Sequence, residues 1–142
     1  MKIIVDVNVV VSTLLNKGIP FNVFFLNSIV NKFEFFAPEF LLAEFEKHEQ
    51  ELIEETKFSK KEFGIIKDFL FKEINFVSKP EFSEFLSKAN ELLKTHVKDI
   101  PYVALALKLN APIFSGDKVL KNCIPDKVLS PREMLDILFK DS

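Results

Sequence analysis

Four acidic residues are the strongest candidates for chemistry in this sequence: Asp6, Glu44, Asp99 and Asp117. Asp6 directly follows the apolar, β-branched run at residues 2–5, and a carboxylate that closes a buried strand is costly without a partner or a metal. Clustered carboxylates repel one another unless a cation neutralises them. Mg²⁺ and Mn²⁺ prefer oxygen ligands, so these four acids together would suit either ion. A metal site of this kind can hydrolyse phosphodiester bonds.

Three of these acids also have ordinary structural explanations. Asp99 precedes Ile-Pro at the start of a predicted helix, where Asp is a frequent N-cap. Asp117 follows Gly116 and fits a turn. Glu44 borders the predicted buried face of its helix, which is marked by Leu41, Phe45, His48 and Leu52. The metal-site hypothesis therefore depends on a fold that gathers the four acids.

The apolar pattern predicts strands that alternate with helices. We expect strands over residues 2–5, 33–37, 74–77, 112–115 and 128–129. We expect helices over residues 9–15, 20–30, 38–55, 59–73, 78–95, 99–109 and 130–139. The first could instead extend the strand before it, and the third and fourth could form a hairpin. Ser59, Ser78 and Ser130 each precede a Glu by three residues, the spacing of a capping box.

This alternation predicts an α/β fold over residues 1–142 as a single domain. We expect a three-layer αβα sandwich that is Rossmann-like. Its central parallel sheet should have about four to five strands and right-handed crossovers. Ligands of open parallel sheets bind beyond the carboxyl ends of the strands. Asp6 and Asp117 follow predicted strands, so we expect both at that edge.

Composition sets broad limits on function. The net charge of −2 argues only weakly against a phosphate-binding surface, because four metal-bound carboxylates would leave the rest of the chain slightly positive. Cys123 is the sole cysteine and long apolar runs are absent, so we expect a cytoplasmic, reduced protein without a membrane span. Phosphate-binding glycine motifs are absent, and the two histidines lack the spacing of a zinc site or a triad.

Seventeen phenylalanines are more than one core of this size ordinarily needs. A Phe-rich core is the simpler explanation, since much of an ordinary protein surface is also apolar. An oligomer interface or a partner groove is the alternative.

Three segments together resemble the PIN domain family. They are VDVNVVVS around Asp6, LLAEF at residues 41–45 and DIPYVALALKLNAPIFSGDKVLK at residues 99–121. The third is the most specific, because an acid opens an Ala/Leu-rich helix that a strand and Ser-Gly-Asp follow. The resemblance implies a metal-dependent endoribonuclease, and many PIN domains are toxins of VapBC-type toxin–antitoxin pairs. It also suggests a small antitoxin partner and a homodimer.

By position, the resemblance assigns the family's acids to Asp6, Glu44, Asp99 and Asp117, with Asn8 and Ser115 as accessory polar residues. We expect the three aspartates to bind Mg²⁺ or Mn²⁺ directly or through water. Glu44 would complete the site and position the attacking water. Lys118 and Lys121 would hold the RNA backbone. Val7 departs from the Thr or Ser common after the first Asp of the family.

Two alternatives remain open. A flavodoxin-like signalling receiver also binds Mg²⁺ with acids at strand ends, but it needs a paired acid near the first strand, where this chain has Asp6 followed by Val7. The other alternative is a catalytically silent PIN-like interaction module, against which the four acids argue.

Overall fold

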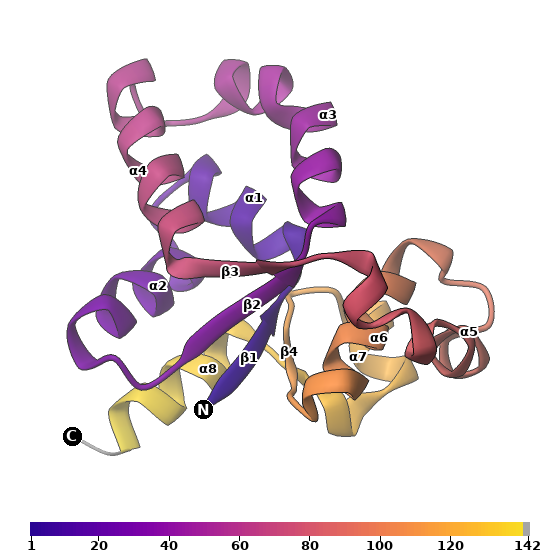
Figure 1. Ribbon diagram of the computed structural model, residues 1–142. Helices are drawn as coiled ribbons and strands as arrows, with labels where there is room; N and C mark the ends of the chain where they lie inside the picture. Colours follow the sequence, from indigo (N-terminus) through magenta and orange to yellow (C-terminus); the bar gives the residue numbers. More distant parts are fainter. Residues whose placement is uncertain (141–142) are drawn as a thin grey trace.

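A five-stranded, fully parallel sheet forms the centre of the computed structural model, which describes residues 1–140. The strands are β1 (Lys2–Val5), β2 (Glu34–Pro38), β3 (Ile74–Val77), β4 (Ile113–Phe114) and β5 (Val128–Leu129). Their order is β3-β2-β1-β4-β5, which places β1 in the middle (Figure 1). Ile3, Ile4 and Val5 are fully buried, as expected for a strand covered on both faces. The α/β prediction is confirmed.

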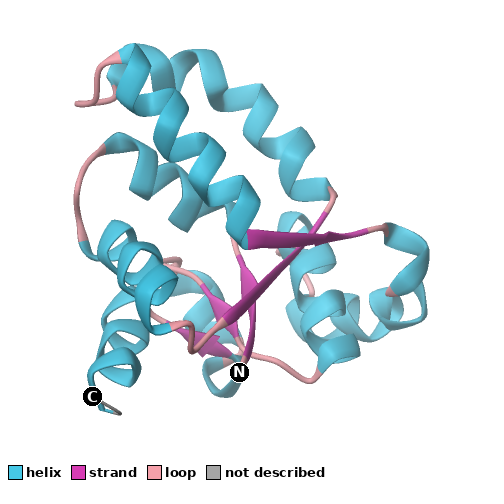
Figure 2. Ribbon diagram, turned by 60° about the vertical axis from the view of Figure 1, so that its left-hand side comes forward, coloured by secondary structure: helices cyan, strands magenta, loops and turns pink. Residues whose placement is uncertain are grey.

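Eight helices surround this sheet within residues 1–140. They are α1 (Val7–Leu15), α2 (Ile19–Val30), α3 (Phe40–Glu55), α4 (Lys60–Glu73), α5 (Leu86–Leu93), α6 (Ile100–Leu109), α7 (Lys118–Cys123) and α8 (Pro131–Lys140). Helices α1 to α4 connect β1, β2 and β3, whereas α5, α6 and α7 connect β3, β4 and β5 from the other side (Figure 1). Helix α8 returns to pack on α2. Figure 2 shows helices on both sides of the strands, so the three-layer prediction is also confirmed.

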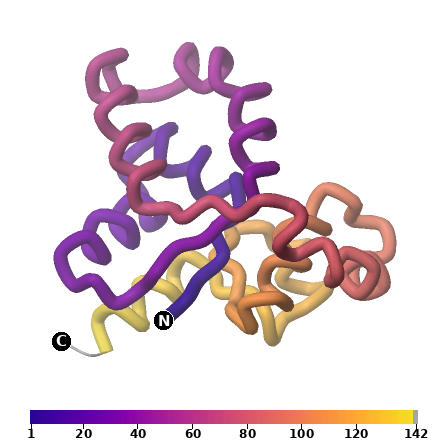
Figure 3. The backbone as a smooth tube through the Cα atoms, viewed as in Figure 1, coloured from indigo at the N-terminus to yellow at the C-terminus, as the bar shows by residue number. Residues whose placement is uncertain are grey.

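The chain changes direction across the sheet between β1 and β4. In Figure 3 the indigo segment of β1 lies between the violet segment of β2 and the orange segment of β4, which are distant in sequence. Crevices at such a reversal are where doubly wound sheets bind ligands. The order also differs from the 2-1-3-4-5 order of flavodoxin-like proteins, which excludes the receiver alternative.

The register of β1 against β4 brings the first strand end and the Ser-Gly-Asp segment together. Val5 pairs with Phe114. The next residue, Asp6, donates its backbone N–H to the carbonyl oxygen of Phe114 at 3.1 Å. Asp6 and Ser115 therefore leave the sheet side by side at its carboxyl edge.

Helices α3 and α4 form the predicted hairpin, joined at the ends farthest from the sheet (Figure 1). The rings of Phe45 and Phe71 meet edge to face at 5.2 Å between centroids. Lys67 pairs with Glu49 across the same interface. These contacts fix the position of α3, the helix that carries Glu44.

Two of the three predicted capping boxes are present, and the third is absent. Ser59 and Ser130 form the predicted capping boxes, with reciprocal bonds to Glu62 and Glu133. Ser78 makes no side-chain cap, because residues 79–85 form two 3₁₀ turns before α5 begins at Leu86. The helix predicted over residues 78–95 was therefore too long.

Two other differences lie next to the site. Pro38 is the last residue of β2 rather than the first of a helix. The short helix α7 (Lys118–Cys123) was not predicted, because six residues carry too little apolar periodicity to reveal it.

Phenylalanines fill much of the core and also reach the surface. The ring of Phe24 lies 5.0 Å from that of Phe35 and 5.6 Å from that of Phe114. Phe25, Phe40 and Phe139, by contrast, are 51%, 38% and 57% exposed. A Phe-rich core therefore accounts for part of the surplus, and the rest is available for contacts outside the chain.

Within residues 1–140, no single helix has the length and apolarity of a membrane span. Helices α1 and α2 meet those criteria only as a pair, and the chain bends by 99° between them.

Candidate active site

Asp6 is the most buried acid of the site. It follows β1 directly and is only 4% exposed. The hydroxyl of Ser115 donates a hydrogen bond to Asp6 Oδ2 at 2.7 Å. The carboxylate is therefore fixed by a neutral donor rather than by a cation.

Ser115 connects the ends of β1 and β4. Its Oγ accepts hydrogen bonds from Asn8 Nδ2 at 3.2 Å and from the backbone N–H of Asp117 at 3.0 Å. Because a hydroxyl has one hydrogen and two lone pairs, these bonds and the one to Asp6 use it completely. Asn8 Oδ1 accepts from the backbone N–H of Gly116 at 3.2 Å. Asn8 and Ser115 thus hold Asp6 and the segment before Asp117 in one arrangement.

The surroundings of Asp6 disfavour its charged form. Burial raises the pKa of Asp6 from 3.8 to about 7, although the bonds from Ser115 and the Asn8 backbone oppose the shift. Asp99 and Glu44 add to it through repulsion. The mutual influence of the three acids places them in one electrostatic neighbourhood.

Asp99 occupies the N-cap position of α6, but its side chain makes no capping bond. The N-cap explanation therefore does not account for its carboxylate. Partial burial raises the pKa of Asp99, and the charges of Asp117 and Glu44 raise it further. His96 and Lys98 act in the opposite direction. Asp99 thus faces more negative than positive charge.

Asp117 acts as a helix N-cap, which is the structural role that the sequence suggested for Asp99. Its Oδ1 accepts from the backbone N–H groups of Val119 at 2.8 Å and Leu120 at 3.2 Å, and so caps α7. The second oxygen, Oδ2, has no hydrogen bond from any residue within 1–140. A helix cap and an available carboxylate oxygen therefore coexist in the same side chain.

Tyr102 is the residue of the site that sequence reasoning missed. It lies one turn after Asp99 on α6, is almost fully buried and donates its hydroxyl to Glu44 Oε1. Burial raises the pKa of Tyr102 well above its usual range, and Glu44 raises it further, so the phenol stays a donor. The signal was present: this chain uses Phe 17 times and Tyr only once.

The sequence predicted that Glu44 borders the buried face of its helix. In the structure Glu44 is half-buried, beside Leu41 and Phe45. His48 was wrongly assigned to the same buried face, since it is exposed. A histidine near one edge of an apolar stripe is easily misplaced, because a small rotation of the helix moves it into solvent.

The donor set fits a hard divalent cation in its chemistry. The ion pairs formed among residues 1–140 are Lys67–Glu49, Lys108–Glu84 and Lys121–Glu133, so none neutralises the four candidate acids. Within the same residues, no three His, Cys, Asp or Glu side chains are close enough to hold an ion as they stand. Mg²⁺ commonly keeps several waters and uses one or two carboxylates plus substrate phosphate, so a tight cage of three is not required.

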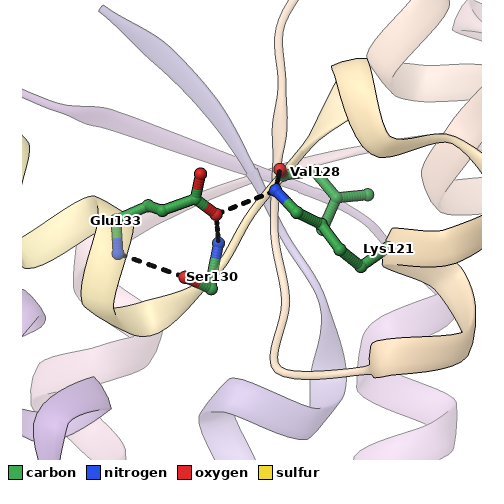
Figure 4. A network of polar contacts seen from close by, with 4 residues as sticks. All are labelled: Lys121, Val128, Ser130 and Glu133. Atoms are coloured by element: carbon green, nitrogen blue, oxygen red, sulfur yellow. Dashed lines mark hydrogen bonds and ion pairs between the residues drawn. The ribbon is translucent and has the colours of Figure 1, made fainter.

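The two lysines predicted to hold RNA have different surroundings. Lys118 is exposed at the start of α7. Lys121 donates to the carbonyl oxygen of Val128 at 2.6 Å and to Glu133 Oε1 at 2.8 Å (Figure 4). Lys121 therefore already has a structural partner, and its contact with RNA stays a prediction.

Comparisons with known proteins agree with the α/β fold. A family model described as a PIN domain matches residues 4–126. A solved structure described as VapBC2 from Rickettsia felis bound to a DNA fragment from their promoter superimposes with a TM-score of 0.66. The alignment covers 92% of this chain and 98% of the other, at 13% sequence identity. A search of curated proteins finds no significant match.

Proposed function

The chain belongs to the PIN domain family, a family of nucleases, and from that premise we propose that it is a metal-dependent endoribonuclease. The observation that carries the proposal is that the carboxylate of Asp6 is buried and has no cationic partner within residues 1–140. Asp99 and Glu44 increase its need for positive charge. A divalent cation together with a phosphate ester would satisfy this site.

In this proposal the three aspartates hold the cation. Mg²⁺ or Mn²⁺, when bound, would lower the pKa of a water and stabilise the charge that develops on the phosphate oxygens. Asp6 would bind through the oxygen that Ser115 leaves available, and Asp117 through the oxygen that does not cap α7. Asp99 would bind from the start of α6.

Glu44 would position the attacking water. Tyr102 already donates to Glu44 Oε1, which fixes the orientation of the carboxylate. The other oxygen remains to accept a proton from the water. A general base of this type contributes about 10²- to 10⁴-fold to a hydrolysis rate.

RNA as the substrate and the toxin role are the finer parts of the proposal. Lys118, exposed beside Asp117, would contact the RNA backbone, and Lys121 is the second candidate. Many PIN domains act in VapBC-type pairs, and the solved structure similar to this chain is a VapBC2. We therefore propose that this chain is the toxin of such a pair, acting in the cytoplasm.

The partner would be a small antitoxin that buries exposed apolar side chains. Helices α2 and α4 border an apolar groove of about 250 Å³ lined in part by Phe21, Phe25, Ile65 and Phe69. Phe25 and Ile65 are 51% and 60% exposed. A homodimer is also expected from the resemblance, and light scattering of the purified chain tests it.

The direct test is cleavage of structured and single-stranded RNA by the purified protein with Mg²⁺, with Mn²⁺ and with EDTA. We expect metal-dependent cleavage that Asp6→Asn reduces by about 10²-fold or more, because the loss of several kcal/mol of charge stabilisation has that effect on a rate. Asp68→Asn, at an exposed acid of α4, is the matched control and should cleave like the wild type.

Cleavage that persists in EDTA or in Asp6→Asn would overturn the proposal. A protein that binds the antitoxin encoded beside it but cleaves none of the RNAs would support the silent interaction module instead. The absence of a neighbouring antitoxin reading frame would count against the toxin role alone.

A further inference from the structure

An apolar pocket of about 450 Å³ lies beside the acidic site. Its walls include Phe40 of α3, Phe82, Leu86 of α5, and Ile100 and Pro101 of α6. Phe40 is 38% exposed, and Val97, another lining residue, is 67% exposed. The pocket is thus open to solvent and presents aromatic and aliphatic side chains to whatever enters it.

The pocket is lined by residues that neighbour the acids of the candidate active site. Ile100 and Pro101 directly follow Asp99. Phe40 and Glu44 lie one turn apart on α3, which places them on the same face of that helix. The ring of Phe40 contacts that of Tyr102 edge-on at 6.2 Å between centroids, and Tyr102 in turn holds Glu44. Phe40 and Tyr102 therefore link the pocket to the acidic site.

Positive charge lies at the same pocket. Lys79 and Lys98 are both exposed lining residues, and neither takes part in the ion pairs formed among residues 1–140. Among residues 1–140, Glu39 is the single acid that lines it. An apolar hollow with cationic side chains suits a ligand that has a flat ring attached to a phosphate.

We propose that this pocket binds one unpaired nucleobase of the RNA, next to the phosphate that is cleaved. The inference rests on the proposed nuclease function and adds to it a pocket for one base, with named stacking and phosphate-binding residues. Proteins recognise single-stranded RNA by stacking splayed bases on aromatic side chains, with lysine or arginine along the backbone. Phe40 is the stacking residue, and Lys79 and Lys98 hold the flanking phosphates.

A base within a duplex does not fit this arrangement. Duplex RNA presents its bases only by their edges in the grooves, so a ring cannot enter the pocket unless its pair opens. The geometry therefore favours loops and unpaired ends over helical stems.

The test uses tryptophan fluorescence, since the chain has no tryptophan of its own. Phe40→Trp places the single reporter in the pocket, and Phe25→Trp places it on α2 as the matched control. Both are made in the Asp6→Asn background with Mg²⁺ present, so that binding is measured without RNA cleavage. The probes are a single-stranded oligonucleotide and a blunt hairpin stem of the same length.

We expect the single-stranded oligonucleotide to quench the Phe40→Trp signal and to leave the Phe25→Trp signal unchanged. In the same background, Phe40→Ala should weaken single-strand binding by about tenfold, the usual effect of removing one stacking aromatic, whereas Phe25→Ala should not. The hairpin stem should bind at least about tenfold more weakly than the single strand.

Three results would overturn the inference: equal quenching of both reporters, equal binding of stem and single strand, or unchanged affinity in Phe40→Ala. A Phe40→Trp signal that shifts with protein concentration and without RNA would show that a second copy of the chain fills the pocket, which also overturns it. If the single strand quenches only Phe40→Trp but the wild type cleaves no RNA, the nuclease proposal is rejected and the base pocket is kept. If the wild type cleaves RNA but quenching is not selective, the base pocket is rejected and the nuclease proposal is kept.

Discussion

Glu133 and the acids around Asp6 lie at the carboxyl edge of the same sheet, but their electrostatic surroundings are opposite. Glu133, at the start of α8, receives hydrogen bonds from Lys121 at 2.8 Å and from the Ser130 backbone at 2.9 Å (Figure 4). The Lys121 bond, aided by that from Ser130, lowers the pKa of Glu133 to about 2. Asp6 lies at the end of β1 without a cation, and burial raises its pKa to about 7.

This difference separates a structural role from the functional role that we propose. Glu133 and Lys121 neutralise each other and fix the start of α8, so nothing external is needed there. Asp6, Asp99 and Glu44 repel one another, and no ion pair among residues 1–140 involves any of them. Buried charges are normally paired or coordinate metals, so the second group supports the cation site that we propose.

The largest expected effect is on stability without metal. Because the folded pKa of Asp6 is about 7 against 3.8, the protonated form favours folding. That contribution is complete below pH 3.8 and is lost as the pH rises through 7. Between these two pKa values, each pH unit corresponds to about 1.36 kcal/mol. In EDTA, the free energy of unfolding should therefore fall by about 3 kcal/mol between pH 5 and pH 8.

Urea unfolding across this pH range measures the effect, and Asp99 should add to it in the same direction. In Asp6→Asn, the free energy of unfolding should change less with pH. At pH 8 it should be higher than in the wild type. Glu133→Gln should keep the wild-type slope, because its acid titrates far lower. Equal slopes in the wild type and Asp6→Asn would refute the unpaired state of Asp6.

Ser115→Ala should affect both stability and cleavage. The substitution removes the hydroxyl bond to Asp6 and leaves the Asp117 N–H without its acceptor. We expect a loss of about 1–3 kcal/mol in urea unfolding and about 10- to 100-fold slower RNA cleavage. Ser87→Ala, at an exposed serine of α5, should change neither; wild-type cleavage by Ser115→Ala would show that Asp6 needs no such support.

Tyr102→Phe should affect catalysis more than folding. The ring stays in the core, but Glu44 loses its donor. Steady-state kinetics should give a kcat about tenfold lower with a similar KM, which corresponds to roughly 1.4 kcal/mol. A change confined to KM, or none, would assign Tyr102 to packing alone.

The smallest effect is expected at the neutralised pair. The side chains of Lys121 and Glu133 are 34% and 46% exposed, so solvent screens their interaction and a double-mutant cycle of Lys121→Met with Glu133→Gln should give about 1 kcal/mol or less. Cleavage should remain within about twofold in Glu133→Gln. Weaker RNA binding in Lys121→Met but not in Glu133→Gln would support an RNA contact by Lys121.

The main elements of the fold could be predicted from the sequence because local patterns determine them. The buried run at residues 2–5 forms β1, and Ser59 and Ser130 form capping boxes with the glutamates three residues later. Ser78 has the same spacing and forms none, because the chain makes two 3₁₀ turns there. Capping residues indicate where a helix can begin, and tertiary packing determines whether it does.

The site was harder to predict than the fold. The acids could be named, but whether Asp99 or Asp117 serves as a cap depends on side-chain orientation, which one sequence does not encode locally. Tyr102 was not among the predicted site residues, and its bond to Glu44 joins residues 58 positions apart. Contacts of that range depend on how α3 and α6 meet.

The most direct test of the cation site is Mn²⁺ titration of the apo protein at pH 7.5, followed by calorimetry and by the thermal unfolding midpoint. Wild type and Glu133→Gln should bind Mn²⁺ and gain thermal stability with increasing metal, whereas Asp6→Asn should bind at least about tenfold more weakly. Equal Mn²⁺ affinity in the wild type and Asp6→Asn would contradict the account, because the unpaired carboxylate at the end of β1 would then have no part in binding the cation.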